Sequence, residues 1–156
     1  MKTCLFKLSI LCSVLALISI TQVNVLSTTA QIPNSIELEA TNLYQAGENY
    51  LKSNQLLAAR SQFERSFQLY EKLNDRQGKF KTSIALAEVY YRQTNYRQAL
   101  QALQQAESLP VDRKQQGRSL TVKGLIYLET GEYQQALFTL QQAESSQIED
   151  IERSNR

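Results

Sequence analysis

QALQALQQAES at residues 98–108 returns as QALFTLQQAES at residues 135–145, so nine of eleven positions are identical at a separation of 37 residues. Shared helical composition alone does not produce an identity this high. Repetition at a fixed period of roughly 20–50 residues is typical of proteins that stack copies of one small structural unit. The two stretches therefore predict a repeat protein.

A third, more diverged copy lies upstream and aligns without a gap when Ala59, Ala99 and Ala136 are matched. Spacings of three and four residues place the matched positions of each copy on single helical faces, with two helices per copy. Small residues let the two helices approach closely, and aromatic side chains fill the space beside that contact. The matched positions are small (Gly47, Ala87, Gly124), tyrosine (Tyr50, Tyr90, Tyr127), large and apolar (Leu56, Tyr96, Tyr133), again large and apolar (Phe63, Leu103, Leu140), and small again (Ser66, Ala106, Ala143).

This order of residue types resembles the tetratricopeptide repeat (TPR) family, whose unit is a helix–turn–helix. The resemblance covers about residues 36–147. It implies an all-α fold, in which three TPR-like helical hairpins stack as a short right-handed α-solenoid after an N-terminal signal or anchor helix. Two features depart from the family pattern. The spacings of 40 and 37 residues exceed the usual period of about 34, and Ser83 stands where the other copies have Leu43 and Leu120.

The expected organisation has repeats at about 36–73, 76–109 and 112–147 within a solenoid of residues 35–147, followed by a polar tail at 148–156. The pairs Ser53-Asn54, Thr94-Asn95 and Thr130-Gly131 lie where each hairpin must turn, and Asn and Gly tolerate the left-handed conformation of a helix end. Pro110 stops a helix, and Asp112 can cap the next. The predicted helices are 35–53, 56–73, 76–93, 96–108, 112–130 and 133–147.

The composition argues against catalysis. The chain has no histidine, and its two cysteines, Cys4 and Cys12, lie in the first dozen residues. The repeats therefore have no thiol nucleophile, no imidazole base and none of the usual zinc ligands. A glycine-rich phosphate loop and an HExxH motif are also missing. We expect no enzyme, no catalytic residues, no metal site and no cofactor.

The first 30 residues form a separate segment. Lys2 and Lys7 precede an apolar stretch at residues 8–20, and a polar stretch ends in Ala30. This order is typical of a secretory signal peptide, with cleavage after Ala30 and a periplasmic or secreted product. The alternatives are a membrane anchor at residues 8–26, which is nearly long enough to span a bilayer, and a buried core helix. Cleavage would remove two lysines and no acids, leaving equal numbers of basic and acidic residues. This balance argues against nucleic-acid binding.

Basic residues gather at the starts of the third and fifth predicted helices. Arg76, Lys79 and Lys81 precede a second group that includes Arg118 and Lys123. Cations near a helix start oppose the helix dipole, so the groups are either a solvated face or a docking strip for an acidic partner. The resemblance implies that the first helices of the hairpins line a peptide-binding groove. Mapped onto this chain, the groove would contain Tyr44, Lys52, Lys81, Ile84, Glu88, Tyr91, Arg92, Arg118, Thr121 and Leu125, with Thr41, Glu48, Leu128 and Glu129 beside them.

The family's chaperone-binding members use an asparagine to hold a terminal carboxylate, and Glu48, Glu88 and Leu125 take its place here. That binding mode is therefore not expected. The leading hypothesis is a non-catalytic scaffold that binds a protein or peptide outside the cytoplasm or at the membrane. The alternatives are a structural module that self-associates through an end of the solenoid, and the front fragment of a larger regulatory TPR protein.

Overall fold

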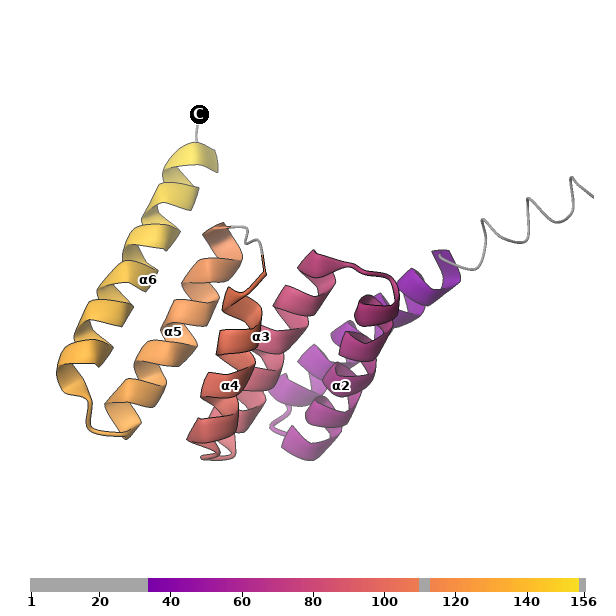
Figure 1. Ribbon diagram of the computed structural model, residues 1–156, viewed down its shortest axis with the longest axis horizontal. Coiled ribbons are helices and arrows are strands. Elements are labelled where there is room, and N and C mark those ends of the chain that lie inside the picture. Colours follow the sequence, from indigo (N-terminus) through magenta and orange to yellow (C-terminus); the bar gives the residue numbers. More distant parts are fainter. Residues whose placement is uncertain (1–33, 110–112, 155–156) are drawn as a thin grey trace, which may run out of the picture. The chain divides into compact units, whose positions relative to one another are not determined.

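The computed structural model describes residues 34–109 and 113–154, which form helices joined by short turns, with no strand among them (Figure 1). The chain divides into two units, Met1–Ile36 and Glu37–Arg156, and the repeats lie in the second. The helices are residues 34–52, α2 (Leu56–Lys72), α3 (Arg76–Arg92), α4 (Tyr96–Glu107), α5 (Arg113–Glu129) and α6 (Tyr133–Ser154).

The first five helices begin and end within one residue of their predicted bounds. The predicted end of the last helix at residue 147 is wrong, because α6 continues to Ser154 and includes most of the expected polar tail. No proline or glycine interrupts residues 133–154, and their side chains are mostly compatible with a helix. The predicted signal or anchor lies outside the described residues. Within these residues, no helix is long and apolar enough to cross a membrane.

Each hairpin closes by placing a small residue against a large apolar one. A Cβ atom added to Gly47 would lie 2.6 Å from the Phe63 ring, and one added to Gly124 would lie 2.6 Å from Leu140. In the middle hairpin, Ala87 and Leu103 share a buried cluster. The aligned small positions are therefore the points where the two helices of a hairpin approach most closely.

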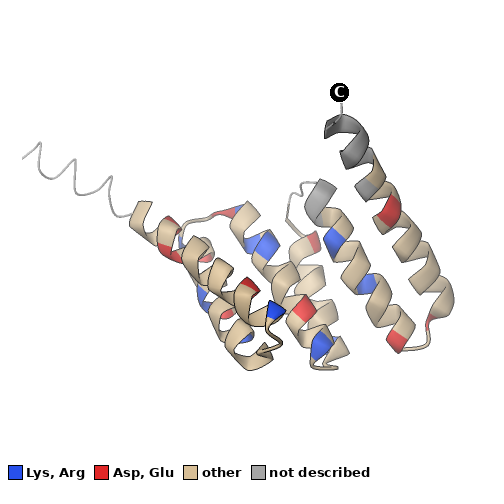
Figure 2. Cartoon of the chain, turned by 180° about the vertical axis from the view of Figure 1, so that it is seen from behind, with Lys and Arg blue, Asp and Glu red and all other residues tan. Residues whose placement is uncertain are grey.

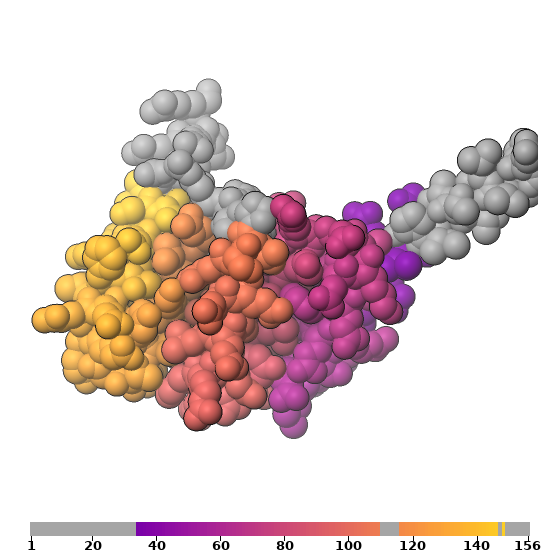
Figure 3. Space-filling view, in the orientation of Figure 1, coloured from indigo at the N-terminus to yellow at the C-terminus, as the bar shows by residue number. Residues whose placement is uncertain are grey.

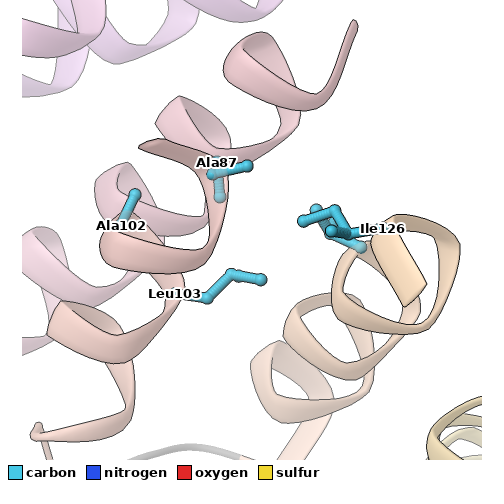
Figure 4. Packing of buried hydrophobic residues seen from close by; sticks show 6 residues of the cluster. Ala87, Ala102, Leu103 and Ile126 are labelled. Carbon is cyan, nitrogen blue, oxygen red and sulfur yellow. The ribbon is translucent and has the colours of Figure 1, made fainter. Parts of the chain in front are cut away.

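The three aligned alanines occupy equivalent buried sites, as predicted. Ala59 and Ala99 have no exposed surface, and Ala136 is 2% exposed. Neighbouring hairpins are joined by α3 and α5, each of which also packs on the preceding hairpin. Figure 4 shows this second contact, with Ile126 of α5 lying opposite Ala87 and Leu103. The stack therefore has a continuous core that no single hairpin could form alone.

The turn inside each hairpin has the same geometry. Asn54, Thr94 and Gly131 adopt positive φ angles of 56°, 59° and 83°. The next residue donates its backbone N–H to a carbonyl five residues earlier, which is the Schellman arrangement that ends a helix. The acceptors are the aligned tyrosines, Tyr50, Tyr90 and Tyr127, at 2.8, 2.9 and 2.8 Å. Tyr50 is 37% exposed, so its side chain lies at the edge of the hairpin rather than in its core.

Candidate functional site

The candidate site is built from the first helix of each hairpin, namely residues 34–52, α3 and α5. Because α3 packs against α2, α4 and α5, it holds a central position among these helices. We use the term groove face for the surface side chains of the three first helices that the sequence assigned to a groove, and for Glu48 beside them. The groove face consists of Tyr44, Glu48, Lys52, Lys81, Glu88, Tyr91, Arg92, Arg118, Thr121 and Leu125.

Arg118 joins all three first helices. Its Nη2 atom lies 2.8 Å from Oε2 of Glu88 in α3 and 3.2 Å from Oε1 of Glu48 in the first helix. Its Nη1 atom donates to the Tyr44 hydroxyl at 3.4 Å. The Arg118 side chain is 39% exposed, and both glutamates are 20% exposed. One guanidinium from the third repeat therefore pairs with acids of both preceding repeats while part of it stays open to solvent.

Glu88 extends the network by binding a second arginine. Its Oε1 atom accepts a hydrogen bond from Arg92 Nη2 at 2.8 Å, one helical turn further along α3. Arg92 Nη1 also donates to the backbone carbonyl of Leu51 at 3.1 Å, near the end of the first helix. The Glu88 carboxylate thus lies between two guanidinium groups, and its charge is more than compensated.

Lys81 is held by aromatic rings instead of acids. Its ammonium lies 4.9 Å from the ring centroid of Tyr44 and 4.8 Å from that of Tyr70. Such cation–π contacts favour the charged amine by about 0.5–1 kcal/mol at exposed sites. The Tyr44 ring in turn packs against Phe63, with centroids 5.5 Å apart. Lys81 is partly buried and takes part in none of the described ion pairs, although Glu37 and Asp75 line the same pocket.

Two groups of the network have shifted pKa values. Burial raises the pKa of Tyr44 to about 12, the charge of Glu48 adds to this shift, and the charge of Arg118 opposes it. Burial of the Arg118 guanidinium acts to lower its pKa. The hydrogen bond to Glu88 and the charges of Glu48 and Glu88 outweigh that effect, so the pKa of Arg118 lies above its usual value. Tyr44 therefore stays protonated and Arg118 stays charged at physiological pH.

Most of the residues predicted from the sequence lie at the surface, as a groove requires. Lys52 and Arg92 are exposed, whereas Tyr44, Lys81, Glu88, Tyr91, Arg118, Thr121 and Leu125 are partly buried. Ile84 is the exception. It is 1% exposed and packs with Phe80 and Ala106 in the core of the second hairpin. Its assignment to the groove is wrong, because at that position α3 faces α4.

The sequence did not indicate one of the partners in the network. Tyr70 belongs to α2, the second helix of its hairpin. Its ring nevertheless makes a cation–π contact with the Lys81 ammonium, and its hydroxyl lies 3.2 Å from Thr41 Oγ1. The sequence feature that could have indicated Tyr70 is Gly78, where an added Cβ would collide with the Tyr70 ring. A glycine in the first turn of a helix admits a large neighbour from the preceding helix.

Charges over the stack are mixed rather than divided by sign (Figure 2). The groove face holds four basic residues, Lys52, Lys81, Arg92 and Arg118, and two acidic ones, Glu48 and Glu88. A third acid, Glu129, lies close enough to Tyr91 for its charge to raise the pKa of that tyrosine. Within the described residues, no group of three or more histidine, cysteine, aspartate or glutamate side chains is arranged to hold a metal ion. The groove face can therefore offer charge pairing, aromatic contact and hydrogen bonds to a ligand.

Comparison with protein families gives two matches. A family model described as tetratricopeptide repeat matches residues 38–110, and a second model with the same description matches residues 117–147. Together they span the first, second and third hairpins. No curated protein matches the chain significantly.

Proposed function

Because the chain belongs to the tetratricopeptide repeat family, we propose that it is a non-catalytic scaffold whose groove face binds an acidic segment of another protein, outside the cytoplasm or at the membrane. Repeats of this family generally bind proteins or peptides. The groove face, the acidic partner and the location are the specific parts of the proposal.

The observation that supports it most directly is the excess of positive charge on the groove face. Four basic residues face Glu48, Glu88 and, beside Tyr91, Glu129, and Glu88 is already shared by Arg92 and Arg118. A partner carboxylate can take the place of Glu48 at Arg118, because that ion pair is the longer one at 3.2 Å. Complementary charge steers a partner to the groove and fixes its register, while Tyr91 and Leu125 add apolar contact.

The binding experiment uses positions outside the Arg118 network, since reversing Arg118 would place three carboxylates together and disturb the fold. A photo-reactive amino acid replaces Lys52, which is exposed on the groove face. The matched control places it at Lys72, which is exposed at the end of α2. We expect a cross-linked protein from position 52 and none from position 72 in the native host.

The captured partner then allows a quantitative test. Lys52→Glu combined with Lys81→Gln should weaken its binding at least tenfold, or about 1.4 kcal/mol, whereas Lys72→Glu should leave binding unchanged. Binding to the wild-type chain should also fall as salt concentration rises. Equal binding by the groove variant and the control would show that the positive charge is only a solvated face.

The proposed location rests on the basic start, apolar stretch and small residue before a polar one in residues 1–31. The intact mass of the protein purified from its host should correspond to a chain that begins at Gln31. A full-length chain extracted from membranes would instead support the anchor at residues 8–26. A full-length soluble chain in the cytoplasm would contradict both locations.

A further inference from the structure

The two interfaces between neighbouring hairpins use the same positions. On the first hairpin, Leu51, Leu56 and Phe63 receive Ala85 and Val89 of α3. On the second hairpin, the aligned residues Tyr91, Tyr96 and Leu103 receive Val122 and Ile126 of α5. In both cases two small or branched apolar residues, four positions apart on one helix, fit against the end of the preceding hairpin.

The third hairpin presents the same positions with no described helix against them. We call this surface the end face, and its exposed apolar residues are Leu128 (46%), Tyr133 (68%), Leu137 (61%) and Ile148 (49%). The first three align with Tyr91, Tyr96 and Leu100 of the second hairpin, which are partly buried against the core there. In Figures 1 and 3, α6 lies at the end of the stack, with no described helix beyond it.

Acidic residues border the end face. Across the interface between the second and third hairpins, Lys123 of α5 pairs with Glu107 of α4 at 2.7 Å. The residue of α6 aligned with Glu107 is Glu144, which is exposed and makes no ion pair with another described residue. Glu129 and Glu132 are also exposed, at the turn between α5 and α6 and away from Glu144. The end face therefore combines apolar side chains with the Glu144 carboxylate, which has no cationic partner among the described residues. The aligned carboxylate of the second hairpin, Glu107, pairs with Lys123.

A second copy of the chain does not fit this surface well. In a head-to-tail contact, the first helix would offer Gln45 and Asn49 at the positions of Ala85 and Val89, and both residues are polar and exposed. In a two-fold contact between end faces, each copy would offer only the residues of its own end face, and none of those named above is a lysine or arginine that could pair with Glu144. The chemistry of the end face calls for a different helix with a basic residue.

We propose that the end face binds an amphipathic helix of a partner protein, which carries two branched apolar residues four positions apart and a lysine or arginine directly after the first. This is the arrangement of Val122, Lys123 and Ile126 in α5. The apolar pair covers Leu128 and Leu137, and the basic residue pairs with Glu144. This site is separate from the groove face and does not depend on the function proposed for it.

The probe for the experiment is a peptide with the sequence of residues 116–130, cross-linked into a helix so that its conformation is fixed before binding. It is titrated into the chain in the form that the cell makes. We expect saturable binding that Leu137→Gln weakens at least tenfold. The matched control is Phe138→Gln, because Phe138 is 63% exposed but points about 100° away from Leu137 around α6 and lines a pocket with Leu120 and Gln142. The control should bind like the wild type.

A charge exchange tests the predicted ion pair. Glu144→Lys should weaken binding of the probe, and a probe carrying Lys123→Glu should bind this variant better than it binds the wild type. The proposal is overturned if the helical probe does not bind, or if Leu137→Gln and Phe138→Gln affect binding equally. Concentration-dependent dimers that Leu137→Gln abolishes would also overturn it, because the occupant would then be a second copy.

Discussion

Replacing Gly47 with alanine sets two effects against each other in the first hairpin. In a helix interior, alanine is more favourable than glycine by about 1 kcal/mol. The added Cβ, however, would lie 2.6, 2.7 and 2.9 Å from three carbons of the Phe63 ring, where carbon atoms normally stay about 3.5–4.0 Å apart. The ring must therefore move by about 1 Å.

Phe63 has little room for that movement. It has no exposed surface, the Tyr44 ring packs against it with centroids 5.5 Å apart, and Leu51 and Val89 belong to the same buried cluster. Overpacking of a filled core destabilises a protein by about 1–3 kcal/mol. After the gain in helix propensity is subtracted, we expect Gly47→Ala to lower the free energy of unfolding by about 1 kcal/mol.

The middle hairpin provides the matched control, because it already packs Ala87 beside Leu103. In a Phe63→Leu background the clash is relieved, so Gly47→Ala should raise the free energy of unfolding by about 1 kcal/mol. The difference between the two backgrounds cancels helix propensity and should amount to about 1–3 kcal/mol of coupling. Urea unfolding of the four proteins measures it. A coupling near zero would refute the close approach of the two helices at Gly47.

Three further predictions concern single side chains. Thr94 is β-branched and has a φ of 59°, so Thr94→Gly should raise the free energy of unfolding by up to about 1 kcal/mol, whereas the same change at Asn54 should have a smaller effect. Ser83 Oγ is the buried side-chain polar atom without a hydrogen-bond partner among the described residues, so Ser83→Ala should stabilise the chain by about 1 kcal/mol in urea unfolding; destabilisation would reveal a partner for it. The pKa of Tyr44 is raised to about 12 in the folded chain, so its contribution to stability is complete below the ordinary tyrosine pKa of about 10 and is lost as pH rises towards 12. Tyr44→Phe should flatten this part of the stability–pH curve.

The fold was largely predictable because its determinants are local and repeated. Ala59, Ala99 and Ala136 mark the same contact in each hairpin, and the register that they define gives the bounds of five helices within one residue. The residue that takes the left-handed conformation in each turn was harder to predict, for a physical reason. The left-handed position falls on Thr94 rather than on Asn95, since the aligned turn geometry overrides the preference of one β-branched residue.

The candidate site was predictable only in part. The family resemblance, mapped onto the chain, assigned residues of each first helix to a groove, and that assignment is wrong for Ile84, which the second hairpin buries. It could not indicate the partners of Arg118, because Glu88 and Glu48 lie 30 and 70 positions away in the sequence. Which side chains of different hairpins meet in space depends on how far one hairpin rotates relative to the next, and no local pattern in the sequence encodes that rotation.

The partners of Arg118 also link binding to the stability of the stack. In most repeat proteins each unit contacts only its neighbours, whereas here Arg118 of the third hairpin bonds to Glu48 of the first. A partner carboxylate that takes the place of Glu48 would therefore remove a connection that skips a repeat, while the bond to Glu88 between neighbouring repeats remains. If the groove binds as proposed, the bound partner replaces this connection with its own contacts. Glu48→Gln should then strengthen partner binding, because it weakens the competitor for Arg118, and weaker binding by this variant would contradict the exchange.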